Sequence, residues 1–180
     1  MEWLNEAPSW SEQGDTLSIR SAPGTDFWRV TYNGVVIDNG HFYYQRQPGD
    51  FQADVKIDGE YAGLYDQAGL MVRRDEKQWM KCGVEFFEGR QHASVVVTHE
   101  FSDWSFVPLP ENVASFWLRV TRKGVTIEVY YSLDGEHYQM LRQAYFTPDE
   151  AIDVGVFCAS PYEPGFAARF EGYSVQEFSL

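Results

Sequence analysis

The 180-residue sequence lacks any uninterrupted apolar run of the ~20 residues that a membrane-spanning helix needs. Its first ten residues, MEWLNEAPSW, contain neither the basic stretch nor the apolar core of a secretion signal. From these two absences we expect a cytoplasmic protein that does not use a membrane as a partner.

Basic residues are also scarce. The chain has 14 Lys and Arg against 27 Asp and Glu, which gives a formal net charge of -13 at pH 7. Because no local basic run offsets this charge, a nucleic-acid backbone or an anionic membrane surface would be repelled. We therefore exclude nucleic acid from the expected partners.

Cysteine is limited to Cys82 and Cys158, and both lie at apolar positions of strand-like segments. In a chain without a secretion signal, two such thiols are typically free and buried. The four histidines are scattered, no Cys/His spacing suggests zinc, and the acidic residues do not form a calcium loop. Phosphate-loop and dinucleotide fingerprints are missing as well, so we expect neither a metal nor a cofactor.

The sequence has almost no helical periodicity, since no segment keeps a 3.6-residue apolar repeat over three turns. At most, TPDEAI at 147–152 is predicted to form one helical turn. Short blocks rich in β-branched and aromatic residues alternate apolar with polar positions instead. These predicted strands are 51–58, 67–74, 78–87, 93–101, 115–122, 125–132, 153–160 and 166–175. Turns are predicted at Asn33-Gly34, Asp58-Gly59, Glu88-Gly89, Lys123-Gly124 and Asp134-Gly135.

Alternating strands cover a core with one side and meet solvent with the other, so many of them predict two packed antiparallel sheets. The chain shows no internal repeat, linker or shift in composition. We therefore predict one all-β domain over 1–180, a sandwich with almost no helix, whose termini pair as edge strands.

Three consecutive predicted strands between 65 and 100 carry an unusual second face. Opposite their apolar positions, we expect the following residues to meet solvent: Gln67, Gly69, Met71, Arg73, Trp79, Lys81, Gly83, Glu85, Ser94, Val96 and Thr98. The two glycines remove side chains from the middle of this face. Polar and aromatic walls around such a floor are typical of a site for a polyhydroxylated ligand.

A sugar offers an apolar C–H face and many hydroxyls, so its site needs a flat aromatic ring beside donors and acceptors. Trp79 and Trp104 are candidates for the ring. The other candidate ligand-binding residues are Lys81, Glu85, Gln67, Arg73, Asp66 and His41. The alternative is purely structural: Lys81 and Glu85 pair with cross-strand neighbours, and Trp79 covers a sheet edge.

Two further segments are interpreted as loops. FSDWSFVPLP follows a predicted strand, and Asp103 or Ser105 is expected to bond local backbone while Trp104 packs down. In DNGH, Asp38 is expected to stabilise an Asn-Gly turn and His41 to begin a strand, with a ligand role for His41 as the alternative.

Several segments together resemble a family of unknown function that includes the yeast regulation-of-enolase protein. They are IDNGHFYY, YDQAGLMVR, WMKCGVEFFEG, SVVVTHEFSDWS, FWLRV, YYSLDG and FCASP. The resemblance implies a concanavalin A-like jelly roll of two antiparallel sheets, in which sugars contact the concave face. A similar pattern also resembles the accessory sandwich of some β-xylosidases. Neither resemblance implies catalysis.

A glycosidase needs two carboxyl groups, about 5–5.5 Å apart if retaining and about 6.5–9.5 Å if inverting. The enzymes of this fold class carry an acidic row on one strand, whereas the comparable positions here hold only Glu85. A second acid would have to come from Asp66 or Asp103. We therefore favour a non-enzymatic module that binds a carbohydrate or small polar ligand. A protein-interaction or regulatory domain acting on a metabolic enzyme is the alternative, and a glycoside hydrolase ranks third.

Overall fold

The computed structural model describes residues 1–111, 113–162 and 164–177, and those residues form sixteen strands and no helix. The strands are β1 (Glu2–Leu4), β2 (Ser9–Gln13), β3 (Thr16–Arg20), β4 (Phe27–Arg29), β5 (Val36–Asp38), β6 (His41–Pro48), β7 (Phe51–Gly59), β8 (Gln67–Arg73), β9 (Gln78–Phe87), β10 (Arg90–His99), β11 (Phe101–Pro108), β12 (Phe116–Lys123), β13 (Thr126–Ser132), β14 (Gln139–Tyr145), β15 (Ala151–Ala159) and β16 (Ala167–Glu177). The described part of the chain therefore holds no helix that is long and apolar enough to span a membrane.

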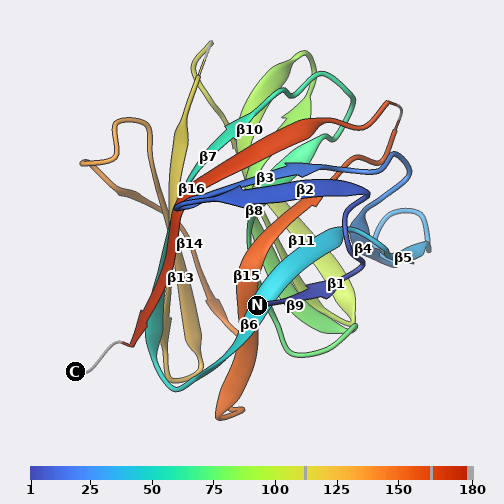
Figure 1. The fold of residues 1–180 in the computed structure, drawn as a ribbon. Helices are drawn as coiled ribbons and strands as arrows, with labels where there is room; N and C mark the ends of the chain where they lie inside the picture. Colours follow the sequence, from blue (N-terminus) through green and yellow to red (C-terminus); the bar gives the residue numbers. More distant parts are fainter. Residues whose placement is uncertain (112, 163, 178–180) are drawn as a thin grey trace.

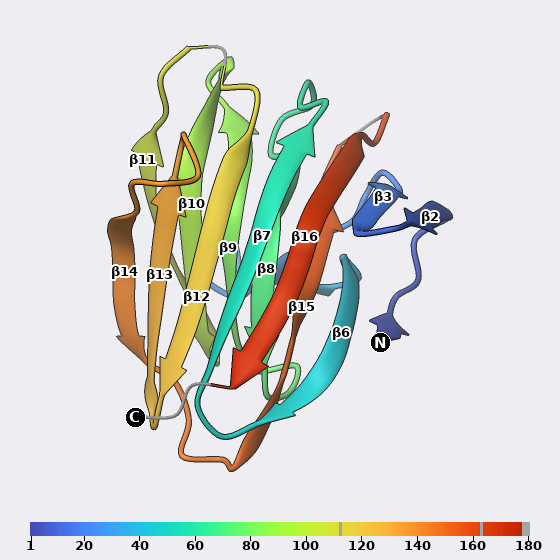
Figure 2. The same cartoon turned by 60° about the vertical axis from the view of Figure 1, so that its left-hand side comes forward.

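Two seven-stranded antiparallel sheets face each other as a sandwich (Figure 1). Sheet A has the order β1-β6-β15-β8-β9-β10-β11, and sheet B has the order β14-β13-β12-β7-β16-β3-β2. Figure 2 shows sheet B in front, with sheet A behind it. The predicted all-β, two-sheet class is confirmed.

One apolar core fills the space between the sheets, because strands of both sheets turn their apolar alternate positions inward. Its fully buried members include Val55, Leu70, Val95, Leu118, Val129, Val156 and Phe170. Cys82 and Cys158 belong to the same core and are free thiols, as predicted. The strand alternation read from the sequence therefore corresponds to the real inner face of both sheets.

The β9–β10 hairpin keeps the polar row in register, because its turn residues Glu88 and Gly89 both have positive φ angles, 52° and 72°. Gly69 and Gly83 are paired across β8 and β9. A Cβ atom at Gly69 would lie 1.8 Å from the Cys82 carbonyl oxygen. Glycine is therefore required at position 69 by the close approach of two strands, before any ligand is considered.

Several local predictions were wrong. Asp58 and Gly59 end β7 instead of forming a turn, and 101–108, predicted as a loop, is the edge strand β11. The segment 147–152 forms no helical turn, because β15 already begins at Ala151. The N-terminal strands β1 and β2 are sheet edges as expected, whereas β16 lies inside sheet B, between β7 and β3.

A third, small sheet decides which side of sheet A meets solvent. Residues 21–40, which we call the strap, contain the paired strands β4 and β5. Figure 1 shows them on the side of sheet A that faces away from sheet B. Phe27 of the strap joins a second apolar cluster with Phe42, Met71, Trp79 and Phe157. The outer face of sheet A is therefore the covered face, and that of sheet B is the open face.

Candidate functional site

The strap buries the face on which the sequence predicted a solvent-exposed ligand site. Trp79 is 0 % exposed, and its ring packs against the ring of Phe27 with centroids 6.1 Å apart. Its indole N–H has no hydrogen-bond partner among the described residues. The expectation that this face meets solvent is wrong, because an apolar strap side chain covers the tryptophan. Trp79 has no open ring face on which a sugar could stack.

Lys81 is neutralised by the strap. Its ammonium donates to Asp26 Oδ1 at 2.9 Å and to the Phe27 carbonyl oxygen at 2.7 Å. The Gln67 amide also donates to Asp26 Oδ1, at 3.0 Å. An ammonium removed from water needs such compensation, because an unpaired buried charge is costly. Lys81 and Gln67 therefore anchor the strap.

Arg73 makes a second anchor of the same kind. Its two terminal nitrogens donate to the two carboxylate oxygens of Asp38, at 2.7 and 2.8 Å. This two-pronged geometry suits a guanidinium and a carboxylate and fixes their relative orientation. Asp38 was predicted to support a turn, whereas it bonds strand β8. The structural alternative paired Lys81 and Glu85 with cross-strand neighbours; Glu85 does bond Ser94 of β10, whereas Lys81 bonds Asp26 of the strap.

Glu85 is a buried acid of the row whose hydrogen bonds go to Ser94 and Trp104 of sheet A and not to the strap. Its Oε2 accepts hydrogen bonds from Ser94 Oγ at 2.7 Å and from the Trp104 indole nitrogen at 2.9 Å. Burial raises the pKa of the Glu85 carboxyl above its usual range, and the nearby charge of Lys81 offsets only part of that effect. A small cavity of about 10 Å³ adjoins it, lined by Gln67, Lys81, Gly83, Glu85 and Ser94 among others.

An aromatic cluster surrounds Glu85 at the end of the covered face. It consists of Tyr65, Phe87, Trp104, Phe106 and Tyr162. The Trp104 ring lies 4.8 Å from the Phe106 ring and 6.2 Å from the Tyr65 ring, between centroids. Phe106 is 45 % exposed and Tyr162 is 54 % exposed. Here, unlike at Trp79, aromatic faces reach the surface beside a buried carboxylate.

Tyr65 has an unusual backbone. Its φ angle is 63°, a left-handed value that few bulky residues adopt. Its amide donates to the Phe86 carbonyl at 2.6 Å, which helps to hold that conformation. Burial raises the pKa of the Tyr65 hydroxyl, and Glu85, Tyr162 and Tyr32 are close enough to raise it further. Tyr32, between β4 and β5, is fully exposed, so the strap brings a further tyrosine near the aromatic cluster.

His41 and Asp66 have structural partners. His41 begins β6 as predicted; its Nε2 accepts from the Ala22 amide at 3.0 Å, so Nδ1 carries the proton and donates to Asn5 O at 2.7 Å. Burial lowers the pKa of this imidazole, consistent with its neutral form. The Asp66 carboxylate accepts from the Gly63 amide at 2.7 Å and from Ser160 Oγ at 2.6 Å. A ligand role for either residue stays a prediction.

Neither acid proposed as a companion for Glu85 lies on its face. Asp103 pairs with Val97, an inward position of β10, and its carboxylate lies 3.6 Å from Arg142. Asp66 is occupied by the hydrogen bonds described above. The acid that does influence Glu85 is Asp26, whose charge raises the pKa of the Glu85 carboxyl. Asp26 is already engaged by Lys81 and Gln67.

Sequence reasoning missed the strap acids and four members of the aromatic cluster. The signal for Phe106 was present, since it has the same parity as Trp104 on one strand. It was hidden because the segment was interpreted as a loop. No signal pointed to Asp26 or Tyr162, which lie in irregular segments far from β9 in the sequence.

No group of three or more His, Cys, Asp or Glu side chains is placed to hold a metal ion within the described ranges. Burial also raises the pKa of both cysteine thiols, which disfavours the reactive thiolate. The site presents aromatic faces beside a buried carboxylate, which accepts from Ser94 Oγ and from the Trp104 indole N–H.

The fold defines a concanavalin A-like β-sandwich, in which one sheet carries a strap-covered polar row. Residues 3–178 match the family described as "Protein of unknown function (DUF1349)", so the chain belongs to that family. It is 35% identical over 173 residues to "Regulation of enolase protein 1" from Saccharomyces cerevisiae, covering 96% of this chain and 87% of that protein. The resemblance inferred from the sequence is thereby confirmed.

Two solved structures share the fold. A functionally unknown protein from Saccharomyces cerevisiae superposes with a TM-score of 0.95 and 34% identity, over 99% of this chain and 97% of that chain. The carbohydrate binding module CBM66 from Bacillus subtilis superposes with a TM-score of 0.62 and 13% identity, over 97% of this chain and 95% of that chain. At that identity the second similarity shows the fold alone.

Proposed function

We propose that the protein is a binding module that recognises a carbohydrate or a similar polar ligand at the aromatic cluster around Glu85. The observation that carries this proposal is Trp104. Its half-buried indole donates to the buried Glu85 carboxylate at 2.9 Å, while its ring contacts the exposed ring of Phe106. Aromatic faces for C–H groups next to acceptors for hydroxyls are what a sugar requires.

The proposal moves the ligand from the middle of the covered face to its end. The strap is anchored by Trp79, Lys81 and Arg73, which do not contact the ligand. The residues that contact it are Trp104, Phe106, Tyr65 and Glu85. The cavity of about 10 Å³ beside Glu85 is near the lower limit for one water. A bound hydroxyl at its mouth would reach Glu85 without displacing the strap.

Glycan-array screening followed by calorimetry with the best glycan tests this function. We expect Trp104→Ala to weaken binding at least about tenfold, because one aromatic contact and one donor are lost. Phe106→Ala, at a more exposed position, provides a second variant that should fold normally. Trp117→Ala, a half-buried tryptophan on the open face, is the matched control and should leave binding unchanged.

Two results would contradict the proposal: no glycan that binds with saturation, or wild-type affinity in both Trp104→Ala and Phe106→Ala. Catalysis is not part of it. Of the acids considered, Asp66, Asp103 and Asp26 are all engaged elsewhere, which leaves Glu85 without a free partner carboxylate.

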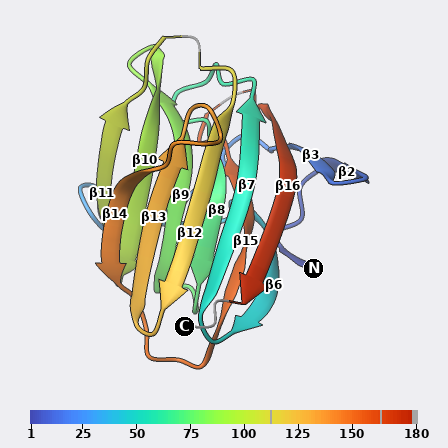
Figure 3. The ribbon, with the colours of Figure 1, turned by 90° about the vertical axis from the view of Figure 1, so that its left-hand side faces the viewer.

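A second function, protein interaction, is favoured by one specific surface. β11 and β14 are the edge strands on the same side of the sandwich, where Figures 2 and 3 both show them together. Arg142 of β14 donates to Ser105 Oγ of β11 at 3.4 Å. The exposed large apolar side chains on these edges are Phe101, Phe106, Val107, Met140 and Tyr145. Exposed apolar edge strands are common docking sites for other chains.

The relative named "Regulation of enolase protein 1" supports a protein partner for this second function. Affinity capture with wild type and with the Phe101→Glu, Met140→Glu double variant tests it. A partner retained by wild type and by Trp104→Ala, but lost by the double variant, is the expected result. No reproducible partner, or equal capture by all three proteins, would count against it.

A further inference from the structure

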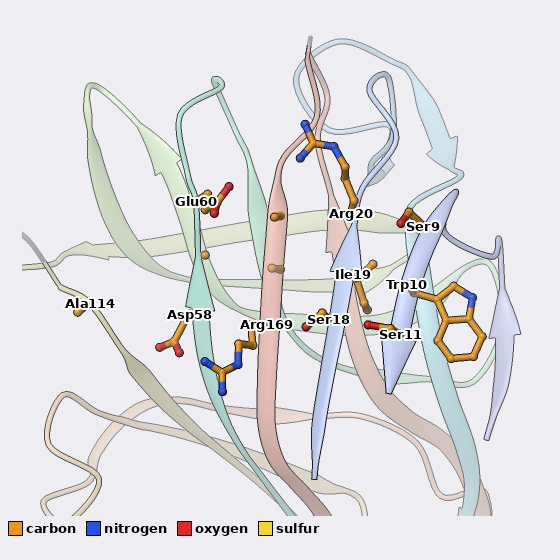
Figure 4. Close-up of a pocket in the computed structure, with 13 residues that line it drawn as sticks. Ser9, Trp10, Ser11, Ser18, Ile19, Arg20, Asp58, Glu60, Ala114 and Arg169 are labelled. Atoms are coloured by element: carbon orange, nitrogen blue, oxygen red, sulfur yellow. The ribbon is translucent and has the colours of Figure 1, made fainter. Parts of the chain in front are cut away.

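A cavity lies on the open face, away from the aromatic cluster. It has a volume of about 500 Å³ and spans β2, β3, β16 and the end of β7 (Figure 4). A second cavity of about 250 Å³ shares Ser11, Ser18 and Arg169 with it. We call the two together the serine trough; the side chains that matter are Ser9, Ser11, Ser18, Arg20, Ala167 and Arg169.

Strand register builds the trough as two parallel rows. Ser9 is paired with Arg20, which is paired with Ala167; Ser11 is paired with Ser18, which is paired with Arg169. Figure 4 shows Ser11 and Ser18 pointing to one side of their strands, whereas the indole of Trp10 points to the other. Neighbouring strands are about 4.8 Å apart. One small polar ligand can therefore contact the serine hydroxyls of two adjacent strands.

The guanidinium of Arg20 is unusual in so acidic a chain. Of the 14 Lys and Arg, it is the only one in the described part of the chain with neither an ion pair nor a side-chain hydrogen bond. The Ser9, Ser11 and Ser18 hydroxyls also have no partner among the described residues. The Arg20 guanidinium and these three hydroxyls are therefore available to a ligand in one cavity.

The other charges of the trough limit where an anion can bind. Arg169 is paired with Glu171, and Asp58 accepts from Ser115 Oγ at 2.6 Å. Glu60 lies at the β7 side, where it would repel an anion. An anionic group is therefore favoured only at the β2–β3 side, where Arg20 and Ser9 are cross-strand neighbours.

We propose that the serine trough binds a polyhydroxylated molecule that carries one anionic group, such as a sugar acid or a sugar phosphate. The anion contacts Arg20 and Ser9, and the hydroxylated body lies along Ser11 and Ser18 toward Arg169. This site is on the opposite sheet from the aromatic cluster and does not depend on the function proposed there.

Calorimetry with three probes tests the trough: digalacturonic acid, glucose 6-phosphate and the neutral xylobiose. We expect saturable binding of at least one anionic probe. Comparing digalacturonic acid with glucose 6-phosphate shows whether the site prefers a carboxylate or a phosphate. Arg20→Gln should weaken that binding at least about tenfold, because a charge-assisted contact is lost. Arg46→Gln removes the same charge from an exposed ion pair with Asp153 and should bind like wild type.

A second variant tests the hydroxyl rows without changing charge. Ser18→Ala removes the hydroxyl at an exposed position without adding bulk, and it should also weaken binding. Trp104→Ala should leave binding in the trough intact. The proposal is overturned if neither anionic probe binds, if Arg20→Gln binds as well as Arg46→Gln, or if xylobiose binds as tightly as the anionic probes.

Discussion

The outer faces of sheets A and B arise from the same alternation of polar and apolar residues, yet the protein treats them in opposite ways. On the covered face, Lys81 is almost fully buried and bonds Asp26 of the strap. On the open face, Lys56 bonds Glu171 of the neighbouring strand, with both side chains about a quarter exposed. One lysine holds a separate segment in place, whereas the other belongs to a solvated surface ladder.

This difference shows that a polar strand position does not by itself indicate a solvent-exposed surface. The strap carries two carboxylates, Asp26 and Asp38, that match two strand cations, Lys81 and Arg73. Phe27 covers Trp79 between these anchors. A face that looks like a binding surface in the sequence is therefore an internal interface between a sheet and its own N-terminal segment.

The largest expected effect separates the two faces through their tryptophans. Trp79→Ala should lower the free energy of unfolding by about 3–5 kcal/mol, because a fully buried indole leaves a cavity under the strap. Trp117→Ala on the open face should cost less than half as much, since that ring is only half-buried and has the Lys56 ammonium 5.7 Å from its centroid. Urea unfolding of both variants measures the difference. Equal losses would mean that the strap does not shield Trp79 in solution.

The next effect compares the two lysines. Lys81→Met should destabilise the protein by about 3 kcal/mol, because Asp26 loses its ion pair in a largely buried setting. Lys56→Met should change stability by less than about 1 kcal/mol, as exposed ion pairs contribute little. The same denaturant titration serves both. A Lys81→Met protein as stable as Lys56→Met would show that the anchor is not needed to hold the strap.

The smallest effect is a pH dependence of opposite sign on the two faces. Burial raises the folded-state pKa of Glu85 above 4.5, so the unfolded chain ionises first as the pH rises. Wild type should therefore lose stability relative to Glu85→Gln as the pH increases above 4.5 through the folded-state pKa. The loss is absent below 4.5, where both states hold the proton.

Glu128 on the open face should behave in the reverse way. Hydrogen bonds from Gln143 and Tyr130 lower its folded-state pKa below 4.5. Wild type should be more stable than Glu128→Gln above 4.5 and lose that advantage as the pH falls through the folded-state pKa. Unfolding curves for both variants across the acidic to neutral range measure the two slopes. Slopes of the same sign would contradict the contrast between the faces.

Much of the architecture could be predicted because strand alternation and turn chemistry are local. The eight predicted strand blocks all correspond to strands, and Glu88-Gly89 forms the expected turn between β9 and β10. Burial of both cysteines followed from their parity. The edge strand β11 was missed because its inward positions include Asp103 and Ser105, which weaken the apolar alternation.

The candidate site was predicted in part. Trp104 and Glu85 were selected from the sequence, and the structure joins them by a hydrogen bond. Trp79 was selected for the same chemical reason and is covered by Phe27. Trp79 lies on the interior strand β9 under Phe27, whereas Trp104 lies on the edge strand β11, and neither position can be found from the parity of their own strands.

By itself, the sequence determined the all-β class, the inward face of each strand and the family, because these depend on local alternation and on the order of short motifs. Only the tertiary structure decided that one polar face is sealed by residues 21–40 and the other left open. Whether a side chain meets water depends on segments far away in the chain. The buried ion pairs of Lys81 and Arg73 arise from that long-range packing.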